Sequence, residues 1–560
     1  MYLKIKDQLK RNIQETLNEL NWNITDEIVL EQPPNKGMGD LSCNIAFVLA
    51  KKLHKSPVEI SKKISEKIEL PLYITEVKTV GPYINFYINY QLFTNKVVNS
   101  IDENYGELAE KETRIILEHT SANPNGPLHI GHLRNSILGD SLKRILEKAG
   151  NKVETQYYVN DMGRQIAIIA WGILNHNIEI KKDKKIDHAI GETYFKSNKL
   201  LGEDPENAKE INDILLEYEK GNNPELIETF KNIVEQCLDG IKETETRLNI
   251  KHDLFKWESS FLRNNDVEEV LEKLQPFTIE DEILYLPLER YGIDKELILR
   301  RSNGTSLYST RDLAYHQYKS VNSDKMIDVL GADHKLAIKQ LSIALELSNN
   351  KKPETVFYEF IDLPSGSMST RKGKFVSVDE FIEESIKHAR EEIEKRDLDL
   401  TEAQKTEVSE IIGIGAIRFY ITQISAEKTI TFKWEEALSF ERGCASIQYA
   451  HARASKLLKK ATFDPYENIH YDYELEEEEK KLIRIISQFP EKIIKTAENK
   501  KVHYISEYSL ELSKAFNKFY KTQQVLGSEY EQERLHIVDA ARITIKNSLK
   551  LLGIKSPEYM

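Results

Sequence analysis

The sequence predicts a multidomain α/β protein, with a small α/β domain first, a parallel-sheet domain with insertions in the middle and an all-α domain last. The chain has 560 residues, which is too long for one hydrophobic core. Its middle part alternates strand-like and helix-like segments, the pattern that builds doubly wound parallel sheets. From about residue 395 onward, one helical pattern follows another.

The composition is that of a globular protein in a reducing compartment. Hydrophobic residues make up 40% of the chain, and no apolar run approaches the roughly 20 residues that cross a bilayer. The first residues lack the apolar core of a signal peptide. Cys43, Cys237 and Cys444 are too far apart for a disulfide framework or a cysteine-rich zinc site. We therefore expect a cytoplasmic protein without a membrane partner. The net charge of −13 argues only mildly against a nucleic-acid partner, because it does not locate the charges.

Residues 1–105 are predicted to form the first domain. The segment 58–68 has a helical period, whereas 77–90 alternates and is rich in aromatic residues, as strands are. A loop rich in proline and glycine, 32–44, belongs to the same unit. A charged stretch at 102–113 then leads into the next domain.

The second domain, 110–390, opens with a βαβ unit. An apolar strand is expected at 114–118, a helix from about Gly131 to Lys148 and a second strand at 152–161. Gly150 follows the helix as a C′ residue. Two polar insertions and three further strand signals are expected later in the domain. The insertions are placed at about 175–240 and 270–305, and the strand signals at 283–292, 326–335 and 354–362.

The third domain, 395–560, is predicted to be helical. Its acidic run at 473–480 is most simply a solvated loop or the start of a helix. The last helix places Arg542, Lys546 and Lys550 at intervals of four, a basic stripe that could follow a phosphate backbone but is more usually a solvated face.

His129 and His132 stand at the start of the helix in the βαβ unit, within NPNGPLHIGH (123–132). A metal site would need a third ligand nearby, and no cysteine, aspartate or glutamate is close in sequence. A plain core role is the second alternative. The third is a phosphate site, because a helix N-terminus beyond a parallel strand offers N–H groups and a positive dipole end. Local chemistry favours phosphate over the other two.

Two further features support the phosphate interpretation. Gly131 has no side chain, so a base or a phosphate could approach the backbone closely. Imidazole donors aimed at a phosphate can stabilise the additional charge of a five-coordinate phosphorus more than the ground state.

The longer segment EHTSANPNGPLHIGHLRNSILGDSLKRILEKAG (118–150) resembles arginyl-tRNA synthetases, in the form common in archaea and some bacteria. The four letters HIGH are the first signature of class I aminoacyl-tRNA synthetases. The resemblance covers nearly the whole chain and is strongest at 114–165 and 306–380. It implies a Rossmann-like (HUP-type) catalytic domain, an N-terminal domain that docks on the D-loop corner of tRNA and a C-terminal anticodon-binding domain.

The resemblance also implies the reaction. Arginine and ATP, which arrives with Mg²⁺, form arginyl-adenylate and pyrophosphate, and arginine then passes to the terminal adenosine of tRNA(Arg). No protein-bound zinc is expected, and activation is expected to need tRNA. Editing should be unnecessary, because a pocket that hydrogen-bonds a guanidinium rejects amino acids without one. The protein is expected to be a monomer.

A guanidinium is always charged and planar, so its pocket needs a carboxylate within bidentate reach. Tyr308 and Asp312 lie four apart, on one face of a helix, and resemble the family's residues at the arginine site. From the residues alone, Asp312 could instead pair with Arg311 or Arg301, and Tyr308 could be core. The residues that the resemblance also assigns to arginine are Glu118, Ser121, Asn123, His132 and His334.

For ATP, the resemblance implicates the residues of the first signature, a strand end and a late loop. These are His129, Gly131, His132, Asp333, His334, Met368 and Ser369. Asn160 and Asp161, at another strand end, also resemble the family, with a turn-stabilising role as the alternative.

The segment 365–381 occupies the place of the second class I signature, a mobile Lys-Met-Ser-Lys-Ser loop. It departs from that consensus, because Ser367 and Thr370 replace both lysines. Some relatives compensate with a lysine just before the first signature, where this chain has Gly126. Arg371 and Lys372 are therefore the expected catalytic substitutes, neutralising the leaving pyrophosphate.

The resemblance implies tRNA contacts in both outer domains. Tyr83 and Asn85 are candidates for stacking on and reading an unstacked base, although alternation favours a core position for one of Tyr83 and Phe86. In the C-terminal domain the candidates are Gln448, Tyr449 and Arg453.

Two rival hypotheses remain. Another class I synthetase is one of them, although the cysteinyl enzyme would need zinc-binding cysteines that the sequence lacks. A catalytically inactive tRNA-binding paralogue is the other, suggested by the altered second signature and opposed by the intact first one.

Overall fold

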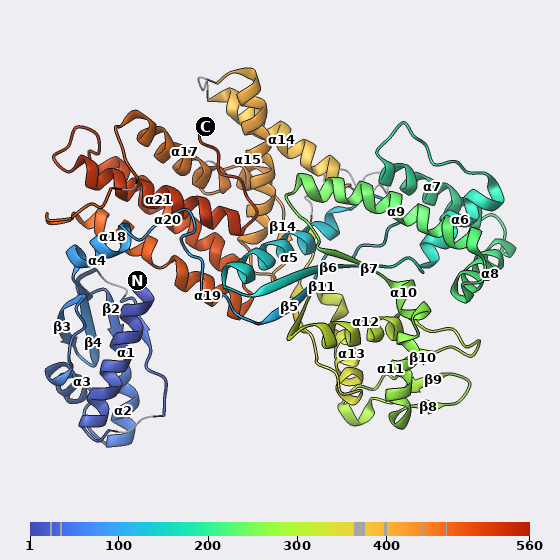
Figure 1. Ribbon diagram of the computed structural model, residues 1–560, viewed down its shortest axis with the longest axis horizontal. Helices are drawn as coiled ribbons and strands as arrows, with labels where there is room; N and C mark the ends of the chain where they lie inside the picture. The colour runs from blue at the N-terminus through green and yellow to red at the C-terminus, as the bar shows by residue number, and fades with distance from the viewer. Residues whose placement is uncertain (23–24, 34–35, 363–375, 397–399, 440, 466) are drawn as a thin grey trace.

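The computed structural model describes residues 1–22, 25–33, 36–362, 376–396, 400–439, 441–465 and 467–560. An N-terminal domain and a C-terminal helical domain lie at one end of the molecule, the central sheet lies in the middle and two insertions lie at the other end (Figure 1). Within the described residues, no helix combines the length and apolar character needed to cross a membrane.

The N-terminal domain packs helices against a four-stranded antiparallel sheet of order β1-β2-β4-β3. The predicted helix and strand pair are confirmed as α3 and β3–β4. Phe86 is buried and Tyr83 is exposed, so one of the two aromatics is core, as alternation indicates. The elements are α1 (Tyr2–Glu19), β1 (Leu30–Glu31), η1 (Lys36–Met38), β2 (Leu41–Cys43), α2 (Ile45–Leu53), α3 (Pro57–Lys67), β3 (Ile74–Val80), β4 (Tyr83–Ile88) and α4 (Tyr90–Val98).

A five-stranded, all-parallel sheet of order β12-β11-β5-β6-β7 forms the centre of the molecule. The predicted βαβ unit is confirmed: α5 runs from Ile130 to Lys148, and Gly150 follows it with φ +88°. The strands are β5 (Arg114–Glu118), β6 (Lys152–Val159), β7 (Leu254–Trp257), β11 (Lys325–Gly331) and β12 (Glu354–Tyr358), and the helices beside them include α6 (Arg164–His176), α12 (Tyr308–Asn322) and α13 (Lys335–Leu347).

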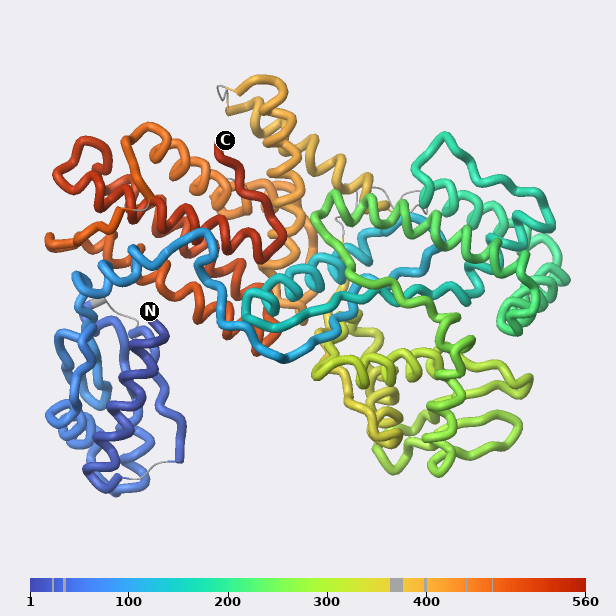
Figure 2. Tube along the Cα trace, viewed as in Figure 1, coloured from blue at the N-terminus to red at the C-terminus, as the bar shows by residue number. Residues whose placement is uncertain are grey.

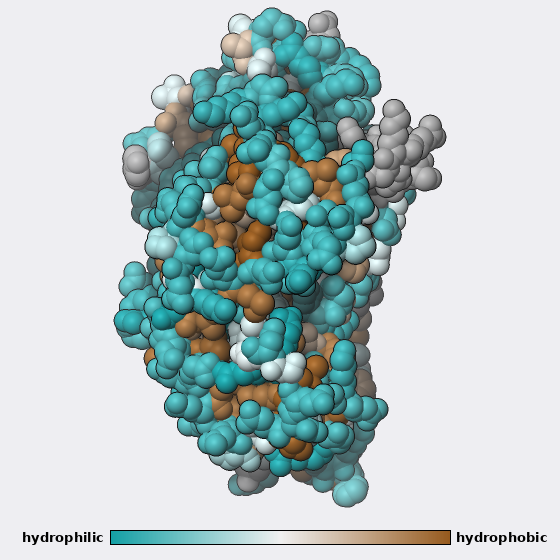
Figure 3. Space-filling view, turned by 90° about the vertical axis from the view of Figure 1, so that its right-hand side faces the viewer, coloured by the Kyte–Doolittle hydropathy of each residue, from teal (hydrophilic) through white to brown (hydrophobic). Residues whose placement is uncertain are grey.

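Two insertions interrupt this α/β domain. The first is helical and contains α7 (Ile186–Leu201), α8 (Glu206–Lys220) and α9 (Pro224–Arg247). The second packs against α12 and α13 in a separate apolar cluster and carries a three-stranded antiparallel sheet. Figure 3 shows the side formed by both insertions, which is mostly hydrophilic with hydrophobic side chains between. The second insertion contains α10 (Glu258–Arg263), α11 (Asp266–Leu274), η2 (Gln275–Phe277), β8 (Ile279–Glu280), β9 (Leu284–Leu286), η3 (Glu289–Tyr291) and β10 (Leu297–Arg300).

The C-terminal part is helical, as predicted. The acidic run 473–480 contains the start of α18, so the helix-start alternative is confirmed; Glu479, however, is buried and paired with Arg534, and is therefore not solvated. The elements are β13 (Ile361–Asp362), α14 (Val378–Lys395), α15 (Glu402–Thr422), β14 (Ile430–Thr431), α16 (Trp434–Ala437), α17 (Cys444–Lys460), α18 (Glu477–Ser487), α19 (Phe489–Asn499), α20 (His503–Thr522) and α21 (Glu531–Leu551).

The connection after α4 runs along the helical domain before it enters β5 (Figure 2). The carboxylate of Glu103 pairs with Arg542 and Lys546, and the amide of Asn547 donates to the carbonyl oxygens of Glu103 and Tyr105. One carboxylate of the linker thus pairs with two members of the predicted basic stripe, and the Lys546 side chain stays 43% exposed.

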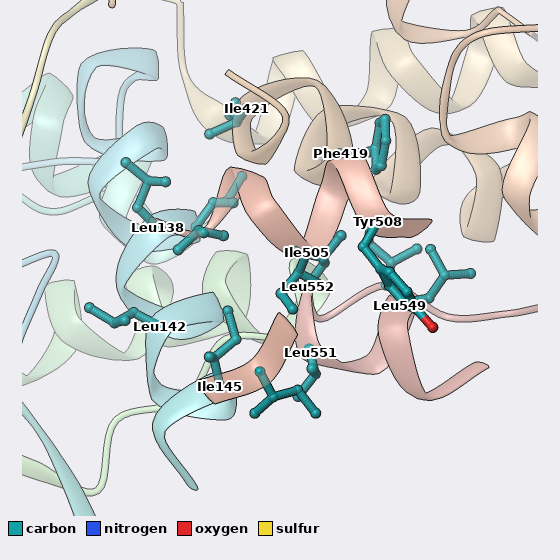
Figure 4. Packing of buried hydrophobic residues seen from close by; sticks show 14 of the residues in the cluster. Leu138, Leu142, Ile145, Phe419, Ile421, Ile505, Tyr508, Leu549, Leu551 and Leu552 are labelled. Carbon is teal, nitrogen blue, oxygen red and sulfur yellow. The ribbon is translucent and has the colours of Figure 1, made fainter. Parts of the chain in front are cut away.

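Helix α5 is the apolar centre that joins the sheet to the helical domain. Leu138, Leu142 and Ile145 of α5 belong to the same buried cluster as Ile505 of α20 and Leu551 at the end of α21 (Figure 4). These contacts place the start of α5, with its two histidines, at a fixed position relative to both domains.

Arg418 of α15 is buried in the same interface and links its two sides by an ion pair and hydrogen bonds. Its guanidinium pairs with Asp140 of α5 and donates to the carbonyl oxygens of Leu248 and Leu552, each at 2.6 Å. Arg418→Met should lower the free energy of unfolding by about 3–5 kcal/mol, because it removes the ion pair and leaves two buried carbonyls without donors. Urea titration measures this loss. The exposed Arg442→Met is the matched control, and a loss equal to that of the control would contradict the prediction.

Candidate active site

The turn after β5 lies at the carboxyl edge of the sheet, where the strand order reverses. β5 pairs with β6 on one side and β11 on the other, and such switch points are where open α/β sheets bind ligands. Thr120 and Ser121 have φ of 67° and 40°, a conformation that costs non-glycine residues about 1–3 kcal/mol each. The turn is held by α5, because Thr120 N–H donates to Asn135 Oδ1 at 2.7 Å and Thr120 Oγ1 donates to Ser136 Oγ at 2.9 Å.

His129 and His132 cap the N-terminus of α5 with their rings. Nδ1 of His129 accepts the backbone N–H of Gly131 at 3.1 Å, and Nδ1 of His132 accepts the backbone N–H of His129 at 3.4 Å. A Cβ at position 131 would lie 2.8 Å from Cε1 of His129. Gly131 is thus needed first to accommodate the histidine ring itself.

These caps set the proton positions of both rings. Burial, and then the neighbouring His129, lower the pKa of His132 to about 3, and burial lowers the pKa of His129. Both rings are therefore neutral near pH 7, and a neutral imidazole that accepts at Nδ1 carries its proton on Nε2. The ring centroids lie only 3.7 Å apart, a spacing that two cations would resist. Each ring thus acts as a neutral Nε2–H donor.

The two histidines line a cavity of about 420 Å³ between the βαβ unit and the first insertion. They are half-buried, which argues against a plain core role. Among the described residues, neither belongs to a group of three side chains that could hold a metal ion. Of the three alternatives, the phosphate interpretation agrees best with this placement. The cavity also includes residues that sequence patterns do not single out: Gln165, Gly191, Tyr194 and Ser377.

The glycine before the first signature is a packing residue. A Cβ at Gly126 would lie 3.2 Å from Cα of Gly191 in α7, so any side chain there requires α7 to shift by a few tenths of an ångström. Cys237 of α9 also lies against the Gly126 carbonyl, at 3.5 Å from Sγ to O. The close approach of the insertion therefore disfavours a lysine at this position.

Tyr308 and Asp312 lie on α12 beside the end of β5. Tyr308 is 50% exposed, so it is not a core residue. Arg311 points away from Asp312 and pairs with Glu258, 2.5 Å from Nε to Oε1, whereas Asp312 lies 3.1 Å from Nδ1 of His316. Asp312 and Arg311 therefore do not form the ion pair that would have given Asp312 a purely structural role.

Glu118 and Ser121 are joined to each other at the same place. Ser121 Oγ donates to Glu118 Oε1 at 3.0 Å and accepts the backbone N–H of Tyr158, also at 3.0 Å. Burial raises the pKa of Glu118, while the ammonium of Lys319 opposes that shift. Asn123 lies farther along the turn, where its amide bonds to Gln165 and Asn160 and lines the histidine cavity.

Other predicted residues lie at strand ends as expected. Asp333 and His334 form a 3₁₀ turn, η4 (Ala332–His334), after β11, and both side chains are exposed. Asp161 is fully buried and accepts hydrogen bonds from the Tyr218 hydroxyl and the Ser259 N–H. These contacts agree with the turn-stabilising role for Asp161, which is therefore not assigned to the active site.

Met368, Ser369, Arg371 and Lys372 lie outside the described residues. The segment directly after that region is held against the first signature. His129 and Ser377 form an antiparallel bridge, Ile130 N–H donates to Val376 O, and Val378 N–H donates to Leu128 O. Residues 376–378 therefore lie beside the first signature.

The N-terminal tRNA candidates differ in exposure. Tyr83 is 44% exposed and makes an edge contact with the exposed Phe47, with ring centroids 5.3 Å apart. Asn85 is buried, and neither polar atom of its amide has a hydrogen-bond partner in the part of the chain that the structure describes. Phe47 was missed because it lies in an otherwise amphipathic helix with no motif around it.

The C-terminal candidates also separate. Gln448 is buried and its amide donates to the carbonyls of Ile411 and Lys555, so it connects helices and is not available to a base. Arg453 lies between the rings of Tyr449 and Tyr520, with its guanidinium carbon 4.6 and 4.8 Å from the two centroids. Both tyrosines are 37% exposed. Tyr520 was missed because only the fold brings α20 beside α17.

Comparison with known proteins agrees with this geometry. The family model described as "tRNA synthetases class I (R), catalytic domain" matches residues 95–434. A parallel sheet with a histidine-capped helix at its switch point, together with this match, defines a class I aminoacyl-tRNA synthetase. The models "Arginyl tRNA synthetase N terminal domain" and "DALR anticodon binding domain" match residues 7–88 and 447–560. The chain belongs to the arginyl-tRNA synthetase family.

Individual relatives match along the full chain. The arginine–tRNA ligase of Methanosphaera stadtmanae is 68% identical over 560 residues, covering all of both chains. That of Methanothermobacter thermautotrophicus is 49% identical, again over all of both chains. Among solved structures, the arginyl-tRNA synthetase of Thermus thermophilus superposes with a TM-score of 0.84 at 27% identity, over 99% of this chain and 100% of that one.

Proposed function

We propose that this chain, as an arginine–tRNA ligase, forms arginyl-adenylate in the cavity at the start of α5, with His129 and His132 as neutral donors to the phosphates of ATP. The observation that carries the proposal is the double histidine cap, which turns each Nε2–H away from the helix backbone. In the first step a carboxylate oxygen of arginine attacks the α-phosphorus and pyrophosphate leaves. The donors stabilise the charge that develops on the five-coordinate phosphorus.

The protein supplies position and charge in this mechanism. The dipole of α5 favours a phosphate at its N-terminus, where the first backbone N–H groups are already bonded to the histidine rings and to Val376, and Mg²⁺ enters as part of the ATP substrate. Asp333 and His334, at the end of β11, are proposed to contact the nucleotide, and Arg371 and Lys372 to neutralise the leaving pyrophosphate. No side chain has to become a covalent carrier, since bringing the two substrates together removes much of the barrier.

The arginine site is proposed at Glu118, Ser121, Asn123, Tyr308 and Asp312, with His132 and His334 bordering the nucleotide. Asp312 offers a carboxylate to the guanidinium, and Tyr308 lies on the same face of α12. In the second step the terminal adenosine of tRNA(Arg) attacks the activated carbonyl and AMP leaves.

For tRNA, we propose two stacking surfaces. One is Tyr83 with Phe47. The buried amide of Asn85 would join this surface only if tRNA binding exposes it. The other is Tyr449, Arg453 and Tyr520; Gln448 is excluded because its amide already serves two carbonyls. A monomeric state and a cytoplasmic location stay predictions, the first of which light scattering tests.

The experiment that tests this function is ATP–pyrophosphate exchange with each amino acid, with and without tRNA. Exchange that is specific for arginine and requires tRNA is the expected result. Exchange with another amino acid would identify a different synthetase, and tight tRNA binding without any exchange would identify an inactive paralogue.

Tyr449→Ala should raise the KM for tRNA about 5- to 150-fold, because one stacked base contributes about 1–3 kcal/mol. The KM for arginine should stay unchanged at saturating tRNA. The matched control is Tyr285→Ala, which removes a half-exposed tyrosine of β9 in the second insertion. Equal KM values for tRNA in the two variants would show that Tyr449 does not bind tRNA.

A further inference from the structure

Behind the proposed arginine site, one face of α12 carries a buried charged network. Tyr315 and His316 are adjacent, and each lies three or four residues from both Asp312 and Lys319, which places all four on one side of the helix. Tyr315, His316 and Lys319 are buried, and Asp312, at the start of the row, keeps partial exposure. The row therefore leads from the open site into the core.

The sheet supplies two carboxylates to this network. Glu118 of β5 and Asp328 of β11 are direct partners in the parallel register, so two buried like charges stand side by side. Lys319 Nζ lies 2.8 Å from Glu118 Oε2 and 2.8 Å from Asp328 Oδ1. Its ammonium thus occupies the place between the carboxylates that a metal cation would otherwise take, and it is held there over the ring of Tyr315, 4.3 Å from the centroid.

His316 extends the network to the open site. Its Nε2 lies 2.9 Å from Asp328 Oδ2, and its Nδ1 lies 3.1 Å from Asp312 Oδ1. The two carboxylates raise the pKa of His316 to about 10 against the opposing effect of burial, so the ring is an imidazolium at pH 7. An imidazolium has a donor at each nitrogen. Nε2–H serves Asp328, and Nδ1–H is shared between the backbone carbonyl oxygen of Asp312, at 2.9 Å, and its carboxylate.

The network holds more acidic than basic groups. The carboxyl groups of Glu118, Asp312 and Asp328 meet only two cationic side chains, His316 and Lys319. Glu118 Oε1 is not bound by either cation and accepts the hydroxyl of Ser121 at the turn, and the Asp312 carboxylate keeps partial exposure beside His316. A further cationic side chain would therefore find its partners at this end of the network.

We propose that Lys319, His316 and Asp328 are positioning residues of the arginine site: they hold Glu118 and Asp312 in place and leave the site with more carboxyl groups than cations, so that it selects a cationic side chain. The inference rests on the proposed function, in that Glu118 and Asp312 bind arginine. Lys319 orients the Glu118 carboxyl group by binding its Oε2. His316 orients Asp312, and Asp328 binds both Lys319 and His316 and so holds them in place.

The test is Lys319→Met in the full-length enzyme, assayed by aminoacylation of tRNA with arginine and ATP varied separately. The KM for arginine should rise about 10- to 100-fold, the usual effect of removing a partner that orients a ligand-binding group, while the KM for ATP changes little. Lys352→Met is the matched control, because Lys352 also pairs with a glutamate at 2.9 Å but lies exposed on the same domain.

A pH profile separates positioning from general damage. Glu118 is faced by Lys319, His316 and Asp312 from α12 and by Asp328 from β11, whereas its neighbour on β6, Gln156, is uncharged. Without Lys319 the pKa of Glu118 rises, so its carboxyl is protonated at low pH and binds arginine poorly. The KM for arginine in the variant should therefore fall as the pH rises from about 6 to about 8.5. In the wild type the same fall in KM should occur at lower pH.

A compensated variant guards against misfolding. Lys319→Met with Asp328→Asn removes one charge of each sign, so it should fold better than the single variant yet still lack the group that aims Glu118. Its KM for arginine should stay raised. If the wild type supports arginine-dependent ATP–pyrophosphate exchange and both variants keep its KM for arginine, the inference is wrong. Failure of the wild type to exchange with arginine would instead overturn the proposed function.

Discussion

His132→Ala should lower the rate of arginyl-adenylate formation about 10²- to 10³-fold while tRNA binding is kept. The factor is that for the loss of one preorganised donor to a developing oxyanion, about 2.7–4 kcal/mol. The donor is Nε2–H, because Nδ1 accepts the backbone N–H of His129. Pre-steady-state formation of AMP-bound arginine, with tRNA present, measures the chemical step directly.

The protonation state of His132 makes the substitution more informative. With a pKa of about 3, the ring acts as a neutral donor, so a neutral amide can replace it in part. His132→Gln should therefore retain more of the rate than His132→Ala. His470→Ala, in an exposed loop of the helical domain, is the matched control. Equal rates in His132→Ala and the control would refute the assigned role.

Asp312→Asn should reduce kcat/KM for arginine roughly 30- to 5000-fold, which corresponds to about 2–5 kcal/mol, because the guanidinium loses its charged partner. The KM for ATP should change little. Asp294→Asn, in an exposed loop of the second insertion, controls for the loss of a carboxylate from the same domain.

Substrate analogues sharpen this prediction. Citrulline has nearly the shape of arginine without its charge, so the wild type should discriminate strongly against it. Asp312→Asn should narrow that discrimination, since the penalty for leaving a carboxylate unpaired disappears. An unchanged ratio of the two amino acids would mean that Asp312 does not face the guanidinium.

Much of the fold could be predicted because its signals are local. Helix α5 follows from apolar residues at helical spacing and a glycine after its end, and β5 and β6 follow from short apolar runs on either side. The switch-point position of His129 and His132 could be predicted for the same reason. A βαβ unit places the start of its helix at the carboxyl end of its first strand.

Other site properties depend on partners far apart in the chain. Gln448 and Tyr449 are neighbours in sequence, yet one amide is buried against Lys555 while the other side chain stays exposed. The charge of Glu118 depends on Lys319, two hundred residues later, and on Asp328 in the adjacent strand. The sequence alone leaves an ion pair between Asp312 and Arg311 possible. In the structure Arg311 pairs with Glu258 instead.

The sequence by itself determined the domain order, the βαβ unit, the signature histidines and the resemblance that led to the arginyl family, because these rest on periodicity and on motifs within single stretches of chain. Only the tertiary structure decided which predicted residues are open to a ligand, which tautomer each histidine holds and how the arginine site is charged. Burial and ion pairing arise when β5, β11 and α12 come together, and their energies depend on distances that no single stretch of sequence contains.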